Sequence, residues 1–144
     1  MSATAEIEQG DALPALAAEH LRSGARLKAR ARGYSMWPFY RDGVLVEIES
    51  CRAADLEIGD VALVETSKGL LLHRVVGHLG QGLLTKGDAR RRVDGVIPPK
   101  RVLGRAPSRP GDRLLGHLSP RVGWGLWLAA NIYRQFFDRF KGRI

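Results

Sequence analysis

Between residues 26 and 105 the chain is a succession of short candidate strands separated by glycine-containing turns. Each apolar run is shorter than a typical helix and is rich in valine, leucine and isoleucine. The first segment alternates strictly between basic and apolar residues, which predicts a half-exposed strand. Candidate strands occupy residues 26–32, 44–48, 61–64, 70–76, 83–85 and 101–105. This pattern predicts a mainly β fold with non-local strand pairing.

Helical patterns occur near the two ends of the chain. Residues 12–22 place leucine and alanine on one helical face, and Asp11 is expected to cap that helix. Residues 1–10 are polar and are expected to be frayed. Residues Val122–Phe140 form a second amphipathic pattern, with aromatic side chains on one face. The predicted organisation is an N-terminal tail and helix over 1–24, a β domain over 25–107, and a linker with a C-terminal amphipathic helix over 108–144.

The chain has 144 residues and a formal net charge of +8. A charge of this sign favours an anionic neighbour such as nucleic acid, a lipid surface or an acidic peptide. The basic residues are spread along the chain, so a solvated basic surface explains the charge more simply. We therefore expect no nucleic-acid partner.

The single cysteine, Cys51, excludes an intrachain disulfide and is expected to be a packed small residue. The four histidines have no metal-ligand spacing, so neither a metal nor a cofactor is predicted. The N-terminus lacks the features of a secretion signal, and no apolar stretch reaches the ~18 residues of a membrane span. These features predict a cytoplasmic or peripheral membrane protein.

The most informative local sequence is Gly-Tyr-Ser-Met-Trp-Pro-Phe at 33–39. Gly33 permits a positive φ or a close backbone approach, and Pro38 restricts the backbone around it. A serine at a rigid corner beside large apolar side chains suits a nucleophile presented to a cleft. The alternative is an ordinary turn in which Ser35 hydrogen-bonds its own backbone.

An acyl-transfer site needs a nucleophile, a base that takes its proton and a group that orients the base. Ser35, His73 and either Asp88 or Asp94 supply these residue types. Taken alone, His73 in an apolar strand is more often structural, and the two aspartates are more often loop caps.

Several motifs follow one another in a single order: Gly-x-Ser-Met-x-Pro, Gly-Asp-Val-x-Leu-Val, His-Arg-Val-Val, Thr-Lys-Gly-Asp with a later aspartate, and Val-Leu-Gly-Arg-Ala. Together they resemble the signal peptidase I family and the related self-cleavage domains of SOS repressors. The resemblance runs from about Leu27 to Ala106. His73 stands where bacterial members carry a lysine, so the chain is similar to the histidine type of archaea and the endoplasmic reticulum.

The resemblance implies a serine endopeptidase on a signal-peptidase or LexA-like catalytic β fold. It makes Ser35 the nucleophile, His73 the general base and Asp94 the acid that orients His73. Asp88 would then shape the site or act as a second acid. The backbone N–H of Ser35 would be one oxyanion donor, while Gly33, Met36 and Pro38 shape the corner.

The chain also departs from the family pattern. Gly33 replaces a serine that donates to the oxyanion in many bacterial members, so a backbone group is expected in its place. Ala89 and Arg90 stand where asparagines usually follow the Thr-Lys-Gly-Asp motif.

The sequence is compatible with three functions. The first is an endopeptidase that cuts a leader or signal-like segment of a partner protein, with small residues next to the cut. The second is a self-cleaving regulatory domain, which would need a DNA-binding domain before Leu27. The third is a non-catalytic peptide-binding module on the same fold.

The C-terminal helix has two interpretations of equal weight. Its aromatic and basic residues suit the headgroup region of an anionic bilayer, which predicts peripheral membrane contact through Val122–Phe140. Alternatively, the helix packs on the β domain and its aromatic residues belong to the core.

Overall fold

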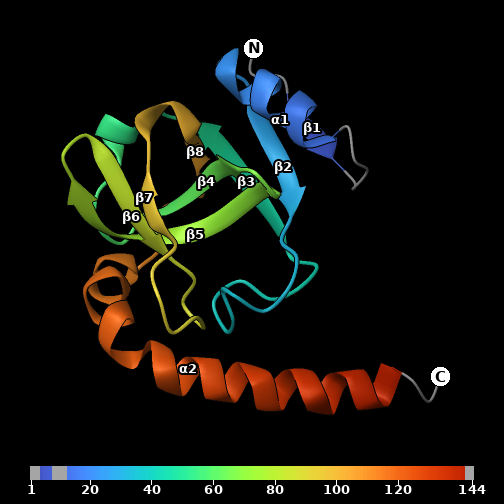
Figure 1. Cartoon of the computed structure of the whole chain (residues 1–144). Coiled ribbons are helices and arrows are strands. Elements are labelled where there is room, and N and C mark those ends of the chain that lie inside the picture. The colour runs from blue at the N-terminus through green and yellow to red at the C-terminus, as the bar shows by residue number, and fades with distance from the viewer. Residues whose placement is uncertain (1–3, 8–12, 142–144) are drawn as a thin grey trace.

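The computed structural model describes residues 4–7 and 13–141 (Figure 1). The strands are β1 (Thr4–Ile7), β2 (Arg26–Arg30), β3 (Leu45–Ser50), β4 (Val61–Thr66), β5 (Gly69–Leu79), β6 (Gly82–Lys86), β7 (Gly95–Ile97) and β8 (Val102–Arg105). The helices are α1 (Leu13–Arg22) and α2 (Asp112–Lys141), with short 3₁₀ turns η1 (Ala53–Asp55) and η2 (Pro99–Arg101). The mainly β class predicted from the sequence is confirmed.

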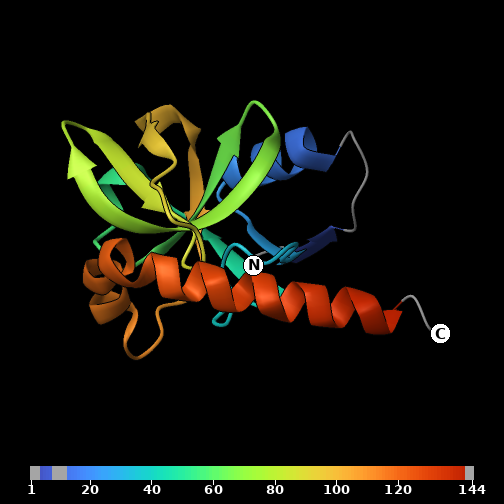
Figure 2. The same ribbon diagram turned by 60° about the horizontal axis from the view of Figure 1, so that its bottom comes forward.

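The strands form one eight-stranded sheet in the order β1-β2-β3-β8-β4-β5-β6-β7. β1 and β2 are parallel, and the other pairs are antiparallel. The sheet curls strongly, with α1 beside β2 and α2 running below the strands (Figures 1 and 2). This arrangement brings Ser35, in the segment after β2, within hydrogen-bond distance of His73 on β5, although the two residues are far apart in sequence.

β4 contributes to both hydrophobic cores because successive side chains of a strand point to opposite faces. Val61 and Leu63 join a core with α1, β2 and β3. Ala62 and Val64 join a second core with β5, β6 and β8. All four side chains are buried, which explains why this strand is a continuous apolar run in the sequence.

The N-terminal region differs in part from the sequence prediction. The expected helix is present as α1, while its predicted cap Asp11 lies outside the described residues. The expectation of a frayed tail over residues 1–10 is wrong for Thr4–Ile7, which form β1 alongside β2. The alternating strand β2 has a second edge to pair, and a short polar segment gives no sequence signal that it will occupy that edge.

Helix α2 begins at Asp112, earlier than the predicted start at Val122. The side chain of Asp112 accepts a hydrogen bond from the N–H of Arg109 at 2.6 Å, which stabilises the start of the helix. Pro120 lies inside the helix rather than before it, and the ribbon bends in this early part (Figure 1). Over the described residues, neither helix is long and apolar enough to cross a membrane.

Two glycines allow the first turns of α2 to touch the β domain. A Cβ on Gly116 would lie 2.4 Å from the backbone nitrogen of Gly59. A Cβ on Gly59 would lie 2.4 Å from the carbonyl oxygen of Asp112. The helix is therefore anchored by direct backbone contact next to the strand that carries His73.

Candidate active site

Ser35 lies in the tight turn that follows β2 in the chain. Gly33 has a φ of +79°, a conformation that favours glycine, and its N–H donates to Asp42 Oδ1 at 2.9 Å. The N–H of Tyr40 donates to the carbonyl of Met36 at 2.9 Å and closes the turn on the other side. The Gly33 N–H is thus engaged by Asp42, and the role of this glycine is to shape the corner.

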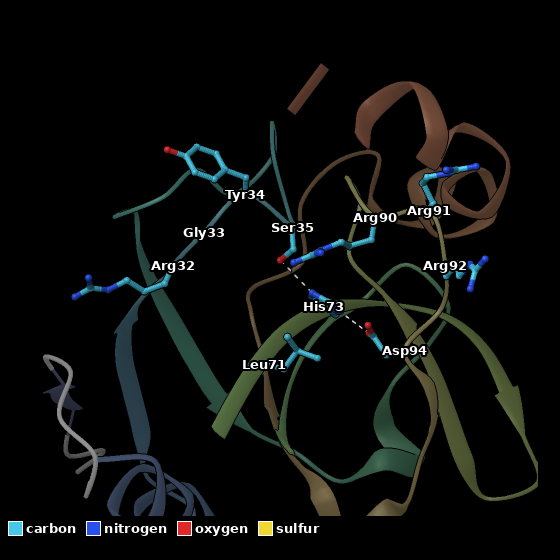
Figure 3. A pocket seen from close by; sticks show the side chains of 10 residues that line it. All are labelled: Arg32, Gly33, Tyr34, Ser35, Leu71, His73, Arg90, Arg91, Arg92 and Asp94. Carbon is cyan, nitrogen blue, oxygen red and sulfur yellow. Dashed lines mark hydrogen bonds and ion pairs between the residues drawn. The ribbon is translucent and has the colours of Figure 1, made fainter. Parts of the chain in front are cut away.

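His73 lies on β5 opposite Ala62 of β4 and is 3% exposed. Its Nε2 lies 3.0 Å from Ser35 Oγ, and its Nδ1 lies 2.5 Å from Asp94 Oδ2. The three side chains form a line from the corner, through β5, to the segment before β7 (Figure 3). The structure therefore brings together the three residues that the resemblance assigned to catalysis.

Thr85 on β6 fixes the position and the hydrogen-bonding role of Asp94. Its hydroxyl donates to Asp94 Oδ2 at 2.8 Å, and its carbonyl accepts from the Asp94 N–H at 2.8 Å. An ionised carboxylate only accepts hydrogen bonds, so the His73 proton resides on Nδ1. Nε2 is then the acceptor of the Ser35 hydroxyl proton. Sequence reasoning assigned no role to Thr85, although it is the first residue of the Thr-Lys-Gly-Asp motif.

The turn that follows β6 is hydrogen-bonded to the Ser35 corner. The Ala89 N–H donates to the Ser35 carbonyl at 2.8 Å, and the Asp88 N–H donates to Met36 Sδ at 3.4 Å. A Cβ on Gly87 would lie 2.7 Å from the Ser35 carbonyl and 3.0 Å from His73 Nε2. Glycine is therefore required here by the close approach of the Ser35 carbonyl and the His73 ring.

The structure places Asp88 on Arg74 and not on His73. Its carboxylate accepts two hydrogen bonds from Arg74, each at 2.8 Å. The expectation that Asp88 caps local backbone N–H groups is therefore replaced by a buried ion pair. Of the two candidate acids, Asp94 contacts His73, and Asp88 contacts the neighbouring residue Arg74.

Arg74 is fully buried and connects the site to α2. It also donates to the Gly59 carbonyl at 2.8 Å and to Asp112 Oδ1 at 2.9 Å. Burial alone would lower the pKa of the Arg74 guanidinium, but the hydrogen bonds and charges of Asp88 and then Asp112 outweigh it and raise the pKa. Sequence reasoning missed this connection because Asp112 had no signal beyond its position in a turn.

Helix α2 also contacts the corner directly. The ring of Tyr133 stacks on Trp37 with centroids 5.5 Å apart, and it meets the edge of Tyr34 at 6.3 Å. Both partners are close neighbours of Ser35 in the chain. The start of α2 therefore supports the site through Asp112, and a later turn supports it through Tyr133.

Two adjoining hollows meet at Ser35. A mainly apolar groove of about 870 Å³ lies between the end of β2 and the start of β5. A second hollow of about 660 Å³ is lined by His73, Asp94 and several arginines (Figure 3). An extended chain lying through both hollows would pass over the Ser35 hydroxyl.

The thiol of Cys51 is also a nucleophile by type. Burial raises the pKa of its thiol to about 11, so it is protonated at neutral pH. This agrees with the expected packed role.

No family model, curated protein or solved structure matches the chain.

Proposed function

We propose that this protein is a serine endopeptidase that cleaves a leader or signal-like segment of a partner protein. The observation that carries the proposal is the hydrogen-bonded line from Ser35 to His73 to Asp94. A non-catalytic binding module has no need for a buried histidine held between a serine and an acid. We further propose that the chain is related to the histidine-type signal peptidases and that it has their catalytic β fold.

The geometry accounts for each proton transfer of an acyl-enzyme mechanism. Ser35 Oγ attacks the carbonyl carbon while His73 Nε2 takes its proton. Collapse of the tetrahedral intermediate breaks the C–N bond, and Nε2 passes the proton to the leaving amine. His73 then takes a proton from a water that attacks the ester, and Nε2 returns this proton to Ser35 Oγ as the C–O bond breaks. Asp94 holds the imidazole in the required tautomer throughout.

The apolar groove suits the segment before the scissile bond. β5 pairs with β4 from Gly69 onward, whereas its pairing with β6 extends only from Arg74 to Leu79. Among the described strands, the outer edge of Leu70–Leu72 thus has no partner. An extended peptide can add to such an edge through its backbone. The small side chains of Ala29 and Ala31 line the opposite wall and leave room for the peptide.

The self-cleaving alternative requires a cleavage site on a linker of the same chain. No contact among the described residues places another segment of the chain in the groove at Ser35. The peptidase acting on a separate substrate is therefore the function that the geometry supports best.

A fluorophosphonate probe tests the proposal without knowledge of the substrate. We expect the probe to phosphonylate Ser35, detected as a mass increase on the peptide that contains it, because His73 activates its hydroxyl. Ser35→Ala and His73→Ala proteins with unchanged unfolding curves serve as controls and should stay unlabelled. A folded wild-type protein that does not react would contradict the proposal.

We also propose that α2 makes peripheral contact with anionic membranes through Val122–Phe140. Ala130 is buried and Tyr133 is docked on Trp37, so one face of the helix is held by the domain. Leu128 and Ile132 lie one turn apart on another face and are 41% and 60% exposed. The exposed face with Leu128 and Ile132 can therefore contact a bilayer while the contacts of the other face keep the helix attached to the site.

Sedimentation with vesicles tests the membrane proposal. The full chain should pellet with vesicles that contain anionic lipid, and less so at high salt, because added salt screens the attraction between charges. A Leu128→Gln, Ile132→Gln double variant should bind less, while a control with Leu79→Gln, an exposed leucine on β5, should bind like wild type. Failure of the wild type to pellet would exclude the membrane role.

A further inference from the structure

The position of the general base decides which half of the substrate lies in which hollow. His73 Nε2 must hand its proton to the leaving amine, so the segment after the scissile bond passes over His73. His73 lines the hollow of about 660 Å³ and does not line the apolar groove. The leaving segment of the substrate therefore runs through the hollow that contains His73.

This hollow is strongly basic. Arg32, Arg90, Arg91 and Arg92 line it, and Asp94 is the one acidic side chain in its lining. Asp94 is already engaged by His73 and Thr85. Within the described ranges, no ion pair holds Arg90 or Arg92, and both are exposed. The hollow thus presents an excess of positive charge where the leaving segment lies.

Arg90 is the best placed of these residues. Its backbone N–H donates to the Gly87 carbonyl at 2.9 Å, within the turn that is hydrogen-bonded to the Ser35 carbonyl through Ala89. Its side chain extends from that turn toward Ser35, whereas Arg91 and Arg92 lie farther out along the same loop (Figure 3). The anchored turn therefore holds the Arg90 guanidinium over the first positions after the cut.

We propose that Arg90, assisted by Arg92, selects substrates with aspartate or glutamate in the first few positions after the scissile bond. A planar guanidinium matches a carboxylate with two parallel hydrogen bonds. The substrate would then combine small or apolar residues before the cut with an acidic segment after it. This inference rests on the proposed peptidase function and specifies its substrate class.

The test uses a proteome-derived peptide library and the full-length protein, with cleavage sites read by mass spectrometry. We expect acidic residues to be enriched within the first three positions after the cut. Two matched peptides from the best cleaved sequence, one with aspartates and one with asparagines there, then give a ratio of kcat/KM. We expect on the order of 5-fold in favour of the acidic peptide for each paired acid, decreasing at high salt.

Arg90→Gln should lower that ratio toward unity. Arg101→Gln, which removes an exposed arginine outside the two hollows at Ser35, should leave it unchanged. The inference is overturned by a library without acidic enrichment, or by Arg90→Gln reducing cleavage of both peptides equally, which would place the guanidinium on the oxyanion.

Fluorophosphonate labelling separates the two proposals. If Ser35 is labelled and no acidic preference is found, only the inference about Arg90 fails, whereas an unlabelled Ser35 overturns the peptidase itself.

Discussion

A Ser35→Ala protein is expected to lose peptide hydrolysis by about 10⁴-fold or more while keeping its fold. The hydroxyl contacts His73 Nε2, and alanine at this position leaves the imidazole without a nucleophile to activate. The fold should persist because the Ser35 carbonyl, which binds the Ala89 N–H, is unaffected. Initial rates on a cleaved library peptide, together with thermal unfolding curves, measure the two effects separately.

The double variant Ser35→Ala, His73→Ala provides the control for this result. Residues that act as one catalytic unit have strongly non-additive effects, so the double variant should be no slower than either single variant. Turnover by Ser35→Ala that approaches wild type, at a matched melting temperature, would assign the chemistry to another residue. Fully additive losses would show that Ser35 and His73 do not act together.

Asp88→Asn is expected to destabilise the protein by about 3–5 kcal/mol, because it leaves the buried Arg74 charge with an incomplete set of partners. Asp88 and Arg74 have side chains that are 1% and 0% exposed, so water cannot replace the lost interaction. Urea unfolding of the variant and of wild type measures the change in the free energy of unfolding.

Asp94→Asn is the matched comparison, since it makes the same chemical change in the other acid. Its side chain is 21% exposed, so we expect little change in the free energy of unfolding. The rate should fall by on the order of 10⁴-fold, because an amide no longer enforces the proton on His73 Nδ1. If Asp88→Asn is stable but inactive and Asp94→Asn is active but unstable, the roles of the two acids must be exchanged.

Local patterns in the sequence were sufficient to predict the strands that build the core. Alternation at 26–32 and the apolar runs from Val61 to Val76 correspond to β2, β4 and β5. Alternation can be recognised from neighbouring residues, because successive side chains of any strand point to opposite faces. The β1 and β7 strands had no such signal, because they are short and exist through pairing with other strands.

The residue types of the site were also predictable, because the sequence offered Ser35, His73 and either Asp88 or Asp94, and the family resemblance favoured Asp94. The contacts that each acid makes are visible only in the tertiary structure. His73 and Arg74 are adjacent on β5 and point to opposite faces, so Asp94 meets one and Asp88 meets the other. The spacing of the two aspartates in the chain does not show which face of β5 each one meets.

For α2, the amphipathic pattern was visible in the sequence, but the residues that the helix contacts were not. Its contacts with the site join Asp112 to Arg74 and Tyr133 to Trp37 across long stretches of chain. The amino-acid sequence by itself determined most of the strands, the corner at Ser35 and the residue types of the candidate site, because these depend on residues that are close together in the chain. The tertiary structure alone decided which acid contacts His73 and which residues line the hollows at Ser35, because those depend on how the sheet curls and which distant segments it brings together.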